Sequence, residues 1–336
     1  MSDTGHGNRP GPPEDPADTP DLVSVGGAMV DRYYRLTNLP EPDGGSFARE
    51  SWHSFGGAAA NVACAASRLG RESGMVTRLG TDEEGGHEWA DAVETDLRDR
   101  DVDTARVRRG PETGTYSMIL AGPGGGRMVV TGGDSVQSLR LRAGDWPYLR
   151  GAGVVATNAY APDPVVADLV AARRDGRIRA LAFDLSGPIP ELRGRGTEPD
   201  TVDDAVAADL VVVGEVALRS YCEHHGVDPT ATGAVDHLRA AGVRRAALTR
   251  GEEGATLVTP DETVEVRAFD VDVVDETGAG DAFFAGLIDA WVLEGRDPTD
   301  AGAFAAAVAA LNCTGEGARG ALPSREAARE LVRERS

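Results

Sequence analysis

The strongest constraint on the fold is an alternation of short apolar runs with longer helical patterns from Ala152 onward. A helix between two strands returns the chain to the same edge of a sheet, so such strands pair in parallel. The pattern therefore predicts an α/β fold: a doubly wound, mostly parallel sheet with helices on both faces. The predicted strands are residues 153–156, 180–184, 210–213 and 245–248, and the predicted helices include residues 164–174 and 233–241.

The first half of the chain departs from this alternation. A glycine-rich turn at residues 122–126 joins two strand-like runs, which is a hairpin signal. Together with two earlier runs, the hairpin is expected to form a small separate sheet, with strands from about 32–55 and 113–131. Such a sheet could act as a lid that excludes water from a bound ligand. An ordinary surface hairpin is the alternative. The four runs are residues 32–37, 47–55, 115–121 and 127–131.

The length of 336 residues suits one large α/β domain with a full core. Residues 1–20 are rich in Pro, Gly and Asp and are expected to be a disordered tail, which leaves residues 21–336 as the folded part. No apolar run could cross a membrane and no signal segment opens the chain, which favours a cytoplasmic protein. The three cysteines and six histidines show no metal-ligand spacing, and His224 and His225 are expected to form a solvated helix end.

The charge of the chain excludes several functions. The formal net charge is −21, and all 34 basic residues are arginine. This acidity disfavours nucleic acids and anionic membranes as partners, and with the lack of lysine it suggests a halophilic source. The lack of lysine also excludes Schiff-base chemistry, the P-loop lysine of NTPases and the strand lysine of protein kinases. Phosphate transfer by this chain would have to rely on backbone amides, arginine and metal ions.

The segment from Asp275 to Asp281 carries the clearest chemical signal. It follows an apolar, β-branched run at residues 271–274, a predicted strand, and leads into a predicted buried helix. Gly278 and Gly280 let the backbone approach a ligand closely, and the free N–H groups at a helix start attract phosphate. Asp281 would then place a carboxylate beside an anion hole, which suits phosphoryl transfer. A tight turn with an acidic helix cap is the alternative.

A second glycine-rich helix start lies in the first quarter of the chain. Gly56 and Gly57 precede an alanine-rich helix that Gly70 ends, and Asn61 lies in its first turns, where its amide could bind sugar hydroxyls. Alone, this pattern often indicates only close packing.

Together, the two segments resemble the ribokinase-like (PfkB-type) carbohydrate kinase family. The Asp-x-Thr-Gly-Ala-Gly-Asp match at residues 275–281 is highly specific, and further matches follow in the family's order. The resemblance implies a three-layer α/β/α fold with a β-sheet lid, and often a homodimer paired through the lid. The further matches are residues 25–31, 56–61, 68–70, 79–85, 102–104, 248–255, 317–318 and 322–323.

The resemblance also implies roles for individual residues. Asp281 matches the catalytic base that deprotonates the acceptor hydroxyl, and the backbone of Gly278, Ala279 and Gly280 matches the anion hole. ATP is the implied phosphoryl donor, Mg²⁺ the implied cofactor and K⁺ the usual monovalent ion. Asp31, Gly56, Gly57 and Asn61 match substrate contacts; Thr249, Gly251, Gly254, Asn312, Gly317 and Ala318 match the nucleotide site; and Asp275 and Thr277 match contributors to a monovalent-cation site.

The chain departs from the family after the predicted strand at residues 210–213. The family has Asn-x-x-Glu there, which organises Mg²⁺ and its waters, whereas residues 214–217 read Gly-Glu-Val-Ala. Only Glu215 remains as a carboxylate for the metal. Loss of such a partner commonly costs roughly ten- to a hundred-fold in affinity or activity.

The leading interpretation is an ATP-dependent kinase that phosphorylates a hydroxyl of a small sugar or sugar derivative. A nucleoside kinase of the same fold is one alternative, with Trp52, Phe55 or Tyr160 as an aromatic clamp on the base. A ligand-binding or regulatory relative with weak activity is the other, because the metal motif is missing.

Overall fold

A computed structural model describes residues 19–81, 86–124 and 126–335. Nearly all of the predicted tail, and residues 82–85 of one family-like segment, lie outside these ranges. Within them, none of the helices combines the length and the apolarity that a membrane crossing requires.

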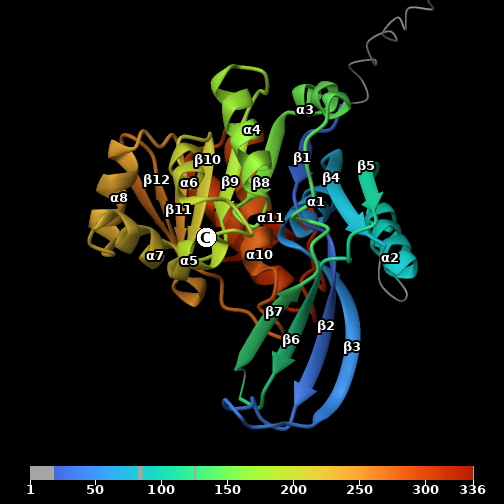
Figure 1. Ribbon diagram of the computed structural model, residues 1–336. Helices are drawn as coiled ribbons and strands as arrows, with labels where there is room; N and C mark the ends of the chain where they lie inside the picture. Colours follow the sequence, from blue (N-terminus) through green and yellow to red (C-terminus); the bar gives the residue numbers. More distant parts are fainter. Residues whose placement is uncertain (1–18, 82–85, 125, 336) are drawn as a thin grey trace, which may run out of the picture.

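The main sheet has nine strands and is shown in Figure 1. The pairings along the sheet from β5 to β11 are all parallel, and β12 pairs antiparallel with both β11 and β13. Helices on both faces bury these strands, which explains their nearly continuous apolar runs. The predicted mostly parallel sheet is confirmed. In spatial order the strands are β13 (Thr263–Val266), β12 (Ala255–Val258), β11 (Ala246–Thr249), β10 (Leu210–Gly214), β9 (Leu181–Leu185), β8 (Val154–Asn158), β1 (Leu22–Val25), β4 (Ser73–Gly80) and β5 (Val102–Gly110).

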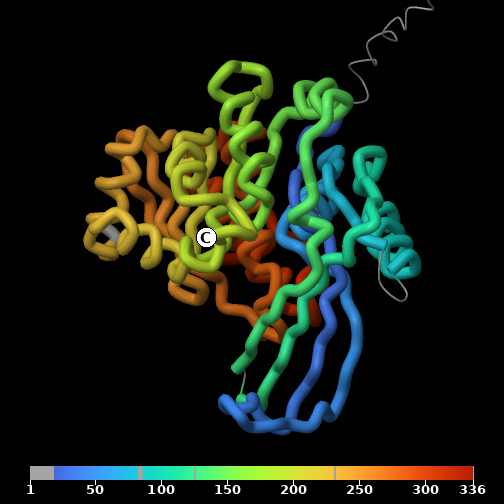
Figure 2. The backbone as a smooth tube through the Cα atoms, viewed as in Figure 1, coloured from blue at the N-terminus to red at the C-terminus, as the bar shows by residue number. Residues whose placement is uncertain are grey.

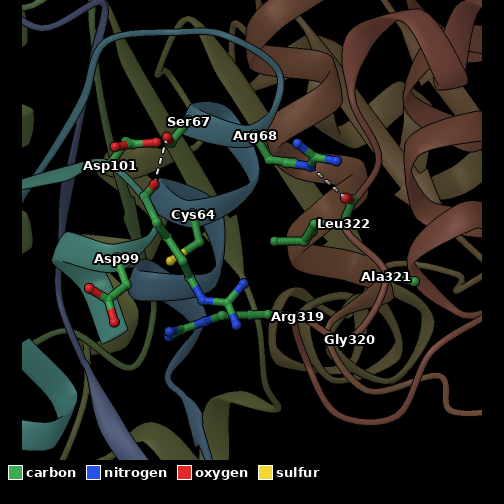
Figure 3. Close-up of a pocket in the computed structure, with 10 residues that line it drawn as sticks. Cys64, Ser67, Arg68, Asp99, Asp101, Arg319, Gly320, Ala321 and Leu322 are labelled. Carbon is green, nitrogen blue, oxygen red and sulfur yellow. Dashed lines mark hydrogen bonds between the residues drawn. The ribbon is translucent and has the colours of Figure 1, made fainter. Parts of the chain in front are cut away.

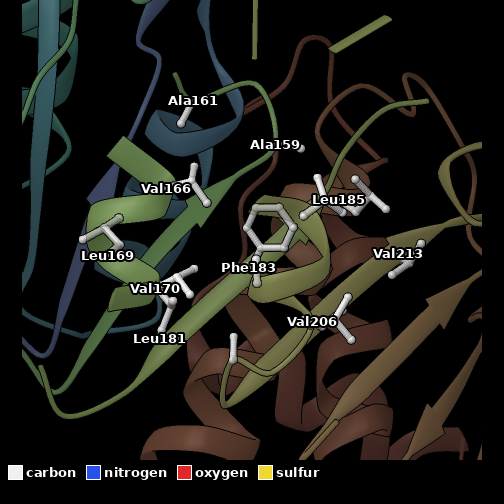
Figure 4. Close-up of a cluster of buried hydrophobic side chains, with 14 of the residues drawn as sticks. Ala159, Ala161, Val166, Leu169, Val170, Leu181, Phe183, Leu185, Val206 and Val213 are labelled. Carbon is white, nitrogen blue, oxygen red and sulfur yellow. The ribbon is translucent and has the colours of Figure 1, made fainter. Parts of the chain in front are cut away.

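Helices complete a three-layer α/β/α arrangement, and each face of the sheet has its own apolar core. Figure 4 shows Phe183 at the centre of one core, packed among valines and leucines. On this face lie η2 (Ala143–Asp145), α3 (Trp146–Gly151), α4 (Asp163–Arg174), α5 (Ile189–Leu192), α6 (Pro199–Ala205), α7 (Glu215–His225) and α8 (Ala231–Ala240). On the other lie α1 (Ala58–Arg68), α9 (Ala279–Leu287), the π-helical segment η4 (Ile288–Leu293), α10 (Pro298–Asn312) and α11 (Arg325–Arg335). Helix α2 (Gly86–Asp99) packs with α1 against β4 and β5, and the short turn η3 (Gly251–Glu253) follows β11.

The predicted second sheet is present, and it extends away from the main sheet in Figure 1. Its order is β3-β2-β6-β7, in which the hairpin β6–β7 joins β2 through a parallel pairing. We refer to this four-stranded sheet as the lid. In Figure 2 an orange segment of the chain passes beside the lid. The lid strands are β2 (Met29–Leu36), β3 (Ala48–Gly56), β6 (Tyr116–Ala121) and β7 (Arg127–Gly132).

The predicted strand at residues 271–274 is wrong, because the last strand of the sheet is β13. Val273 and Val274 are 56% and 62% exposed. The backbone N–H groups of Val274 and Asp275 both donate to the carbonyl of Cys313 instead of to a neighbouring strand. This apolar, β-branched run therefore forms a connecting segment, because it pairs with no strand edge of the described sheets.

Candidate active site

The strand order places a ligand crevice beside β1. The chain continues from β1 to β4 and β5 on one side, and from β8 to β11 on the other, so the order reverses between β1 and β8. In doubly wound sheets ligands bind at the carboxyl ends of the strands at such a point. Gly26 follows β1 here, and a Cβ on it would lie 2.9 Å from the Cβ of Ala59 at the start of α1. The first turn of α1 is thereby held against this crevice.

Helix α9 begins with the glycine geometry that the sequence predicts. Gly278 has a left-handed backbone, with φ of 78°, and a Cβ there would lie 2.3 Å from the carbonyl oxygen of Ala318. Only glycine fits this position. No atom of a neighbouring element lies within 4 Å of the Cβ position at Gly280, so that side of the loop is open. Asp281 lies in the first turn of the helix, next to these amides.

Asn61 joins the two glycine-rich segments. Its Nδ2 donates a 2.7 Å hydrogen bond to Oδ2 of Asp281, and its Oδ1 accepts a 2.7 Å bond from Nε of Arg319. The buried Arg319 guanidinium also donates to the carbonyl of Gly56 at 2.9 Å and pairs with Asp96. The structure therefore brings together the first and last quarters of the chain at one carboxylate.

Three carboxyl groups share this region, the buried Asp31 and the half-buried Asp184 and Asp281. Burial raises the pKa of Asp281 to about 7, while the hydrogen bond from Asn61 opposes the rise and the nearby Asp184 adds to it. Burial also raises the pKa of Asp184 to about 6. The pKa of Asp31 rises to about 6 for the same reason, against the opposing charge of Arg319. A base with a pKa near 7 is well matched to proton transfer at neutral pH.

Asp184 and Asn158 are candidate site residues that the sequence patterns did not single out. Both line a small cavity together with Asp281. Each lies at or beside the carboxyl end of a parallel strand, β9 or β8, where the strand order reverses. A polar residue at the end of a predicted strand is the signal that could have identified them.

The predicted substrate-binding residues Asp31, Gly56 and Gly57 pack closely. A Cβ on Gly56 would lie 2.0 Å from Oδ2 of Asp31, so the carboxylate lies directly against the backbone. Gly57 has φ of 96°, and a Cβ there would lie 2.5 Å from the carbonyl of Gly27. The diglycine is thus required by packing, and it lets Asp31 of the lid approach the start of α1.

The predicted cation-site residues link the predicted anion loop, residues 275–280, to the chain near residue 317. Asp275 Oδ1 accepts from the backbone N–H of Thr277, and Oδ2 accepts from that of Gly317, each at 2.9 Å. The fully buried Asn312 donates to the carbonyls of Ala318, at 3.2 Å, and Thr277, at 3.4 Å. Any effect of Asn312 on a nucleotide would therefore act through these two backbone segments.

The predicted nucleotide turn follows β11. Thr249 ends the strand, and the backbone N–H of Arg250 donates to the carbonyl of Gly254 at 2.8 Å. Gly251 and Gly254 have φ of 54° and 89°, values that favour glycine. The guanidinium of Arg250 pairs with Glu265 at 2.8 Å, on the neighbouring strand β13.

Glu215, the predicted metal partner, is exposed at the start of α7 and pairs with Arg219 at 3.0 Å. Ala217 is buried against the sheet. Glu215 is therefore a solvent-facing carboxylate, whereas the half-buried Asp184 lines a small cavity together with Asp281.

The lid contacts the anion loop. Arg127 Nη1 donates a 2.8 Å hydrogen bond to Oγ1 of Thr277. Of the aromatic residues considered for a nucleoside clamp, Trp52 stacks on Tyr33 within the lid, with ring centroids 5.0 Å apart. Tyr160 is 46% exposed, and its hydroxyl lies 3.4 Å from the carbonyl of Ser186.

A cavity of about 550 Å³ lies on the far side of α1 from Asp281. Figure 3 shows Arg319 and Cys64 at its wall and Arg68 bonded to the carbonyl of Leu322. Arg319 thus separates this cavity from Asn61. Asp281 lines the smaller of the two cavities and not this one.

Comparisons with known proteins agree with this geometry. The model of the pfkB family carbohydrate kinases matches residues 19–325. An ATP-dependent ribose-1-phosphate kinase of Halopiger xanaduensis is 31% identical over 319 residues, which cover 94% of this chain and 98% of that protein. A nucleoside kinase of Methanothermobacter thermautotrophicus is 28% identical over 316 residues, covering 90% and 92%.

Solved structures show the same fold. The ribokinase of Arabidopsis thaliana complexed with ribose and ATP has a TM-score of 0.78 at 24% identity and covers 94% of this chain and 99% of its own. The family match spans both glycine-rich helix starts and all four strands of the lid. The chain therefore belongs to the pfkB family of carbohydrate kinases and is a phosphotransferase.

Proposed function

We propose that this chain is an ATP-dependent kinase that phosphorylates a hydroxyl group of a small sugar or sugar derivative, with Asp281 as the general base. The observation that carries the proposal is the position of Asp281. Its carboxylate lies in the first turn of α9, bonded to Asn61 and next to the amides of residues 278–280. The N–H of Ala279 donates to the carbonyl of Glu276 at 3.1 Å, and the loop is open at Gly280.

In the proposed reaction, Asp281 takes the proton of the acceptor hydroxyl as its oxygen attacks the γ-phosphorus of ATP. The new P–O bond forms while the bond to the β-phosphate oxygen breaks, which releases ADP. The amides of Gly278, Ala279 and Gly280 hold the negative charge on the transferring group. Asn61 orients the base, and closure of the lid excludes water that would compete with the acceptor.

The residues present fit a magnesium-supported reaction. Mg²⁺ prefers oxygen ligands and is usually held by one or two carboxylates together with substrate phosphates. Glu215 and Asp184 are the carboxylates that would hold it or its waters, and Asp275 and Thr277 supply oxygens for a monovalent cation. When bound, Mg²⁺ would neutralise charge on the β- and γ-phosphates.

The acceptor is proposed to be a sugar rather than a nucleoside. Trp52 is occupied by its stack on Tyr33, so it is not free to clamp a base. Similarity to a ribose-1-phosphate kinase also supports a sugar derivative. The nucleoside alternative depends on Phe55, which packs against the core between α1 and α2, or on Tyr160, which is 46% exposed.

A panel of acceptors assayed for ADP release in high KCl tests the proposal. Ribose, ribose 1-phosphate, fructose and inosine represent the classes. We expect a sugar to give turnover, and Asp281→Asn to lower kcat at least about a thousand-fold, since the base is lost. Asp168→Asn, an exposed carboxylate on α4, is the matched control and should keep wild-type activity. Ligand binding by calorimetry without ADP release from any acceptor would support the regulatory alternative instead.

A further inference from the structure

The end of α7 brings two histidines together with an aspartate from another helix. His224 and His225 are the last residues of α7, before Gly226, and Asp203 lies on α6. The ligand atoms of the three side chains all lie within 4.8 Å of one another, and Nε2 of His225 is 2.8 Å from Oδ1 of Asp203. The cluster lies at the opposite end of α7 from Glu215, so it is separate from the proposed phosphate site.

We propose that Asp203, His224 and His225 bind a divalent transition metal, for which Zn²⁺ is the best fit. Donor atoms around a tetrahedral Zn²⁺ lie about 3.4 Å apart, so small rotations of the three side chains would bring them into place. Two imidazole nitrogens and one carboxylate oxygen suit zinc, whereas Mg²⁺ and Ca²⁺ prefer oxygen ligands alone. The three protein ligands leave the fourth position for water.

The surroundings hold the cluster in place and suit a cation. The ring of Tyr221 lies 4.5 Å from that of His225, and the ring of His237 lies 4.8 Å from it. The carboxyl end of α7 also contributes its negative dipole end.

The spacing of the histidines in the sequence does not predict this site. The expected helix end is present, and Gly226 has the left-handed backbone typical of such ends. The third donor, however, comes from α6 through the tertiary fold. A metal here would connect α6 to α7 without contacting Asn61 or Asp281.

The test uses the full-length protein after treatment with a chelator, in KCl buffer with excess Mg²⁺ to saturate weak acidic sites. Calorimetric titration with ZnCl₂ should show one equivalent bound with a saturable isotherm. Addition of Co²⁺ should give the visible bands of a four-coordinate complex. Saturating Zn²⁺ should raise Tm by about 3 °C, because it binds only the folded state.

Matched variants separate this site from general surface binding. Asp203→Asn keeps the shape of the side chain and should weaken Zn²⁺ binding at least about ten-fold, and His224→Ala with His225→Ala should abolish it. His87→Ala removes an exposed histidine on α2 and should bind Zn²⁺ like the wild type. Wild-type Zn²⁺ affinity in the double variant, or in Asp203→Asn, would overturn the proposal, as would the absence of saturable binding. Circular dichroism of each variant checks that it folds.

Discussion

Asn61 and Asp281 are separated by 220 positions in the chain, yet a 2.7 Å hydrogen bond joins their side chains. The bond is directed: the amide N–H donates to the carboxylate, so it favours the charged form of Asp281. Arg319 fixes the amide in this orientation by donating to its oxygen. Asp281, the proposed base, is thus both positioned and kept partly ionised by residues outside its own helix.

Removal of this hydrogen bond should shift the pH dependence of the reaction. Asn61 lowers the pKa of Asp281 against the effect of burial, so in Asn61→Ala the pKa should rise above its value of about 7. The acidic limb of the kcat profile should move to higher pH, and kcat at pH 7 should fall by about ten-fold or more. A pH–rate profile measures both. An unchanged acidic limb would show that Asn61 does not tune the base.

Asp281 should make the protein less stable as the pH rises. Its folded-state pKa of about 7 lies above the ordinary value of 3.8, so the folded state holds a proton that the unfolded state has lost between these values. The cost in unfolding free energy is absent below about pH 4, grows as the pH rises between these two pKa values, and is complete above about pH 7. Asp281→Asn should therefore be more stable than the wild type at pH 8 and similar to it near pH 4. Thermal unfolding at both pH values, with Asp168→Asn as the control, tests this prediction.

The contact between the lid and the anion loop should affect closure. Arg127→Ala removes the donor to Thr277, so we expect a higher KM and a kcat lower by about three- to ten-fold, because the closed state is less populated. Arg49→Ala, an exposed arginine on β3 of the same sheet, is the control. Equal effects of both substitutions would indicate a general effect of charge on the lid.

Glu215 should influence the requirement for magnesium. Glu215→Gln removes the charge at the start of α7 and frees Arg219, so the Mg²⁺ concentration for half-maximal activity should rise by about ten-fold. Titration of activity with MgCl₂ measures the change. Unchanged Mg²⁺ dependence would assign the role to Asp184.

The outer edge of the lid should support pairing of two chains. Met128, Val129 and Val130 of β7 are about half exposed on an edge strand whose other side pairs with β6. Exposed apolar edge strands favour association. Val129→Lys and Val130→Glu together should shift a dimer to monomer in light scattering, if the lid forms the interface. A dimer that persists in this variant would place the interface elsewhere.

The sequence allows the sheet and lid to be predicted because their patterns are local. The strands ending near Asp184 and Val213 are apolar throughout, since helices cover both faces. The segment at residues 271–274 is also apolar and β-branched, but it pairs with no strand of the described sheets. Composition alone does not show whether a neighbouring strand is available for pairing. The sequence patterns did not single out Asp184, or Asp203 beside His225, for a related reason. The residues around each of them come from other helices and strands, which local periodicity does not reveal.

The bonds of Asp275 and Asn312 have a mechanical consequence. They tie the loop that would hold the phosphates to the stretch around Gly317 that would lie near adenine, so the two should move as one rigid body. A compound that binds beneath the stretch around Gly317 would therefore distort the proposed phosphate-binding loop without contacting it. Such an inhibitor would need no resemblance to either the donor or the acceptor.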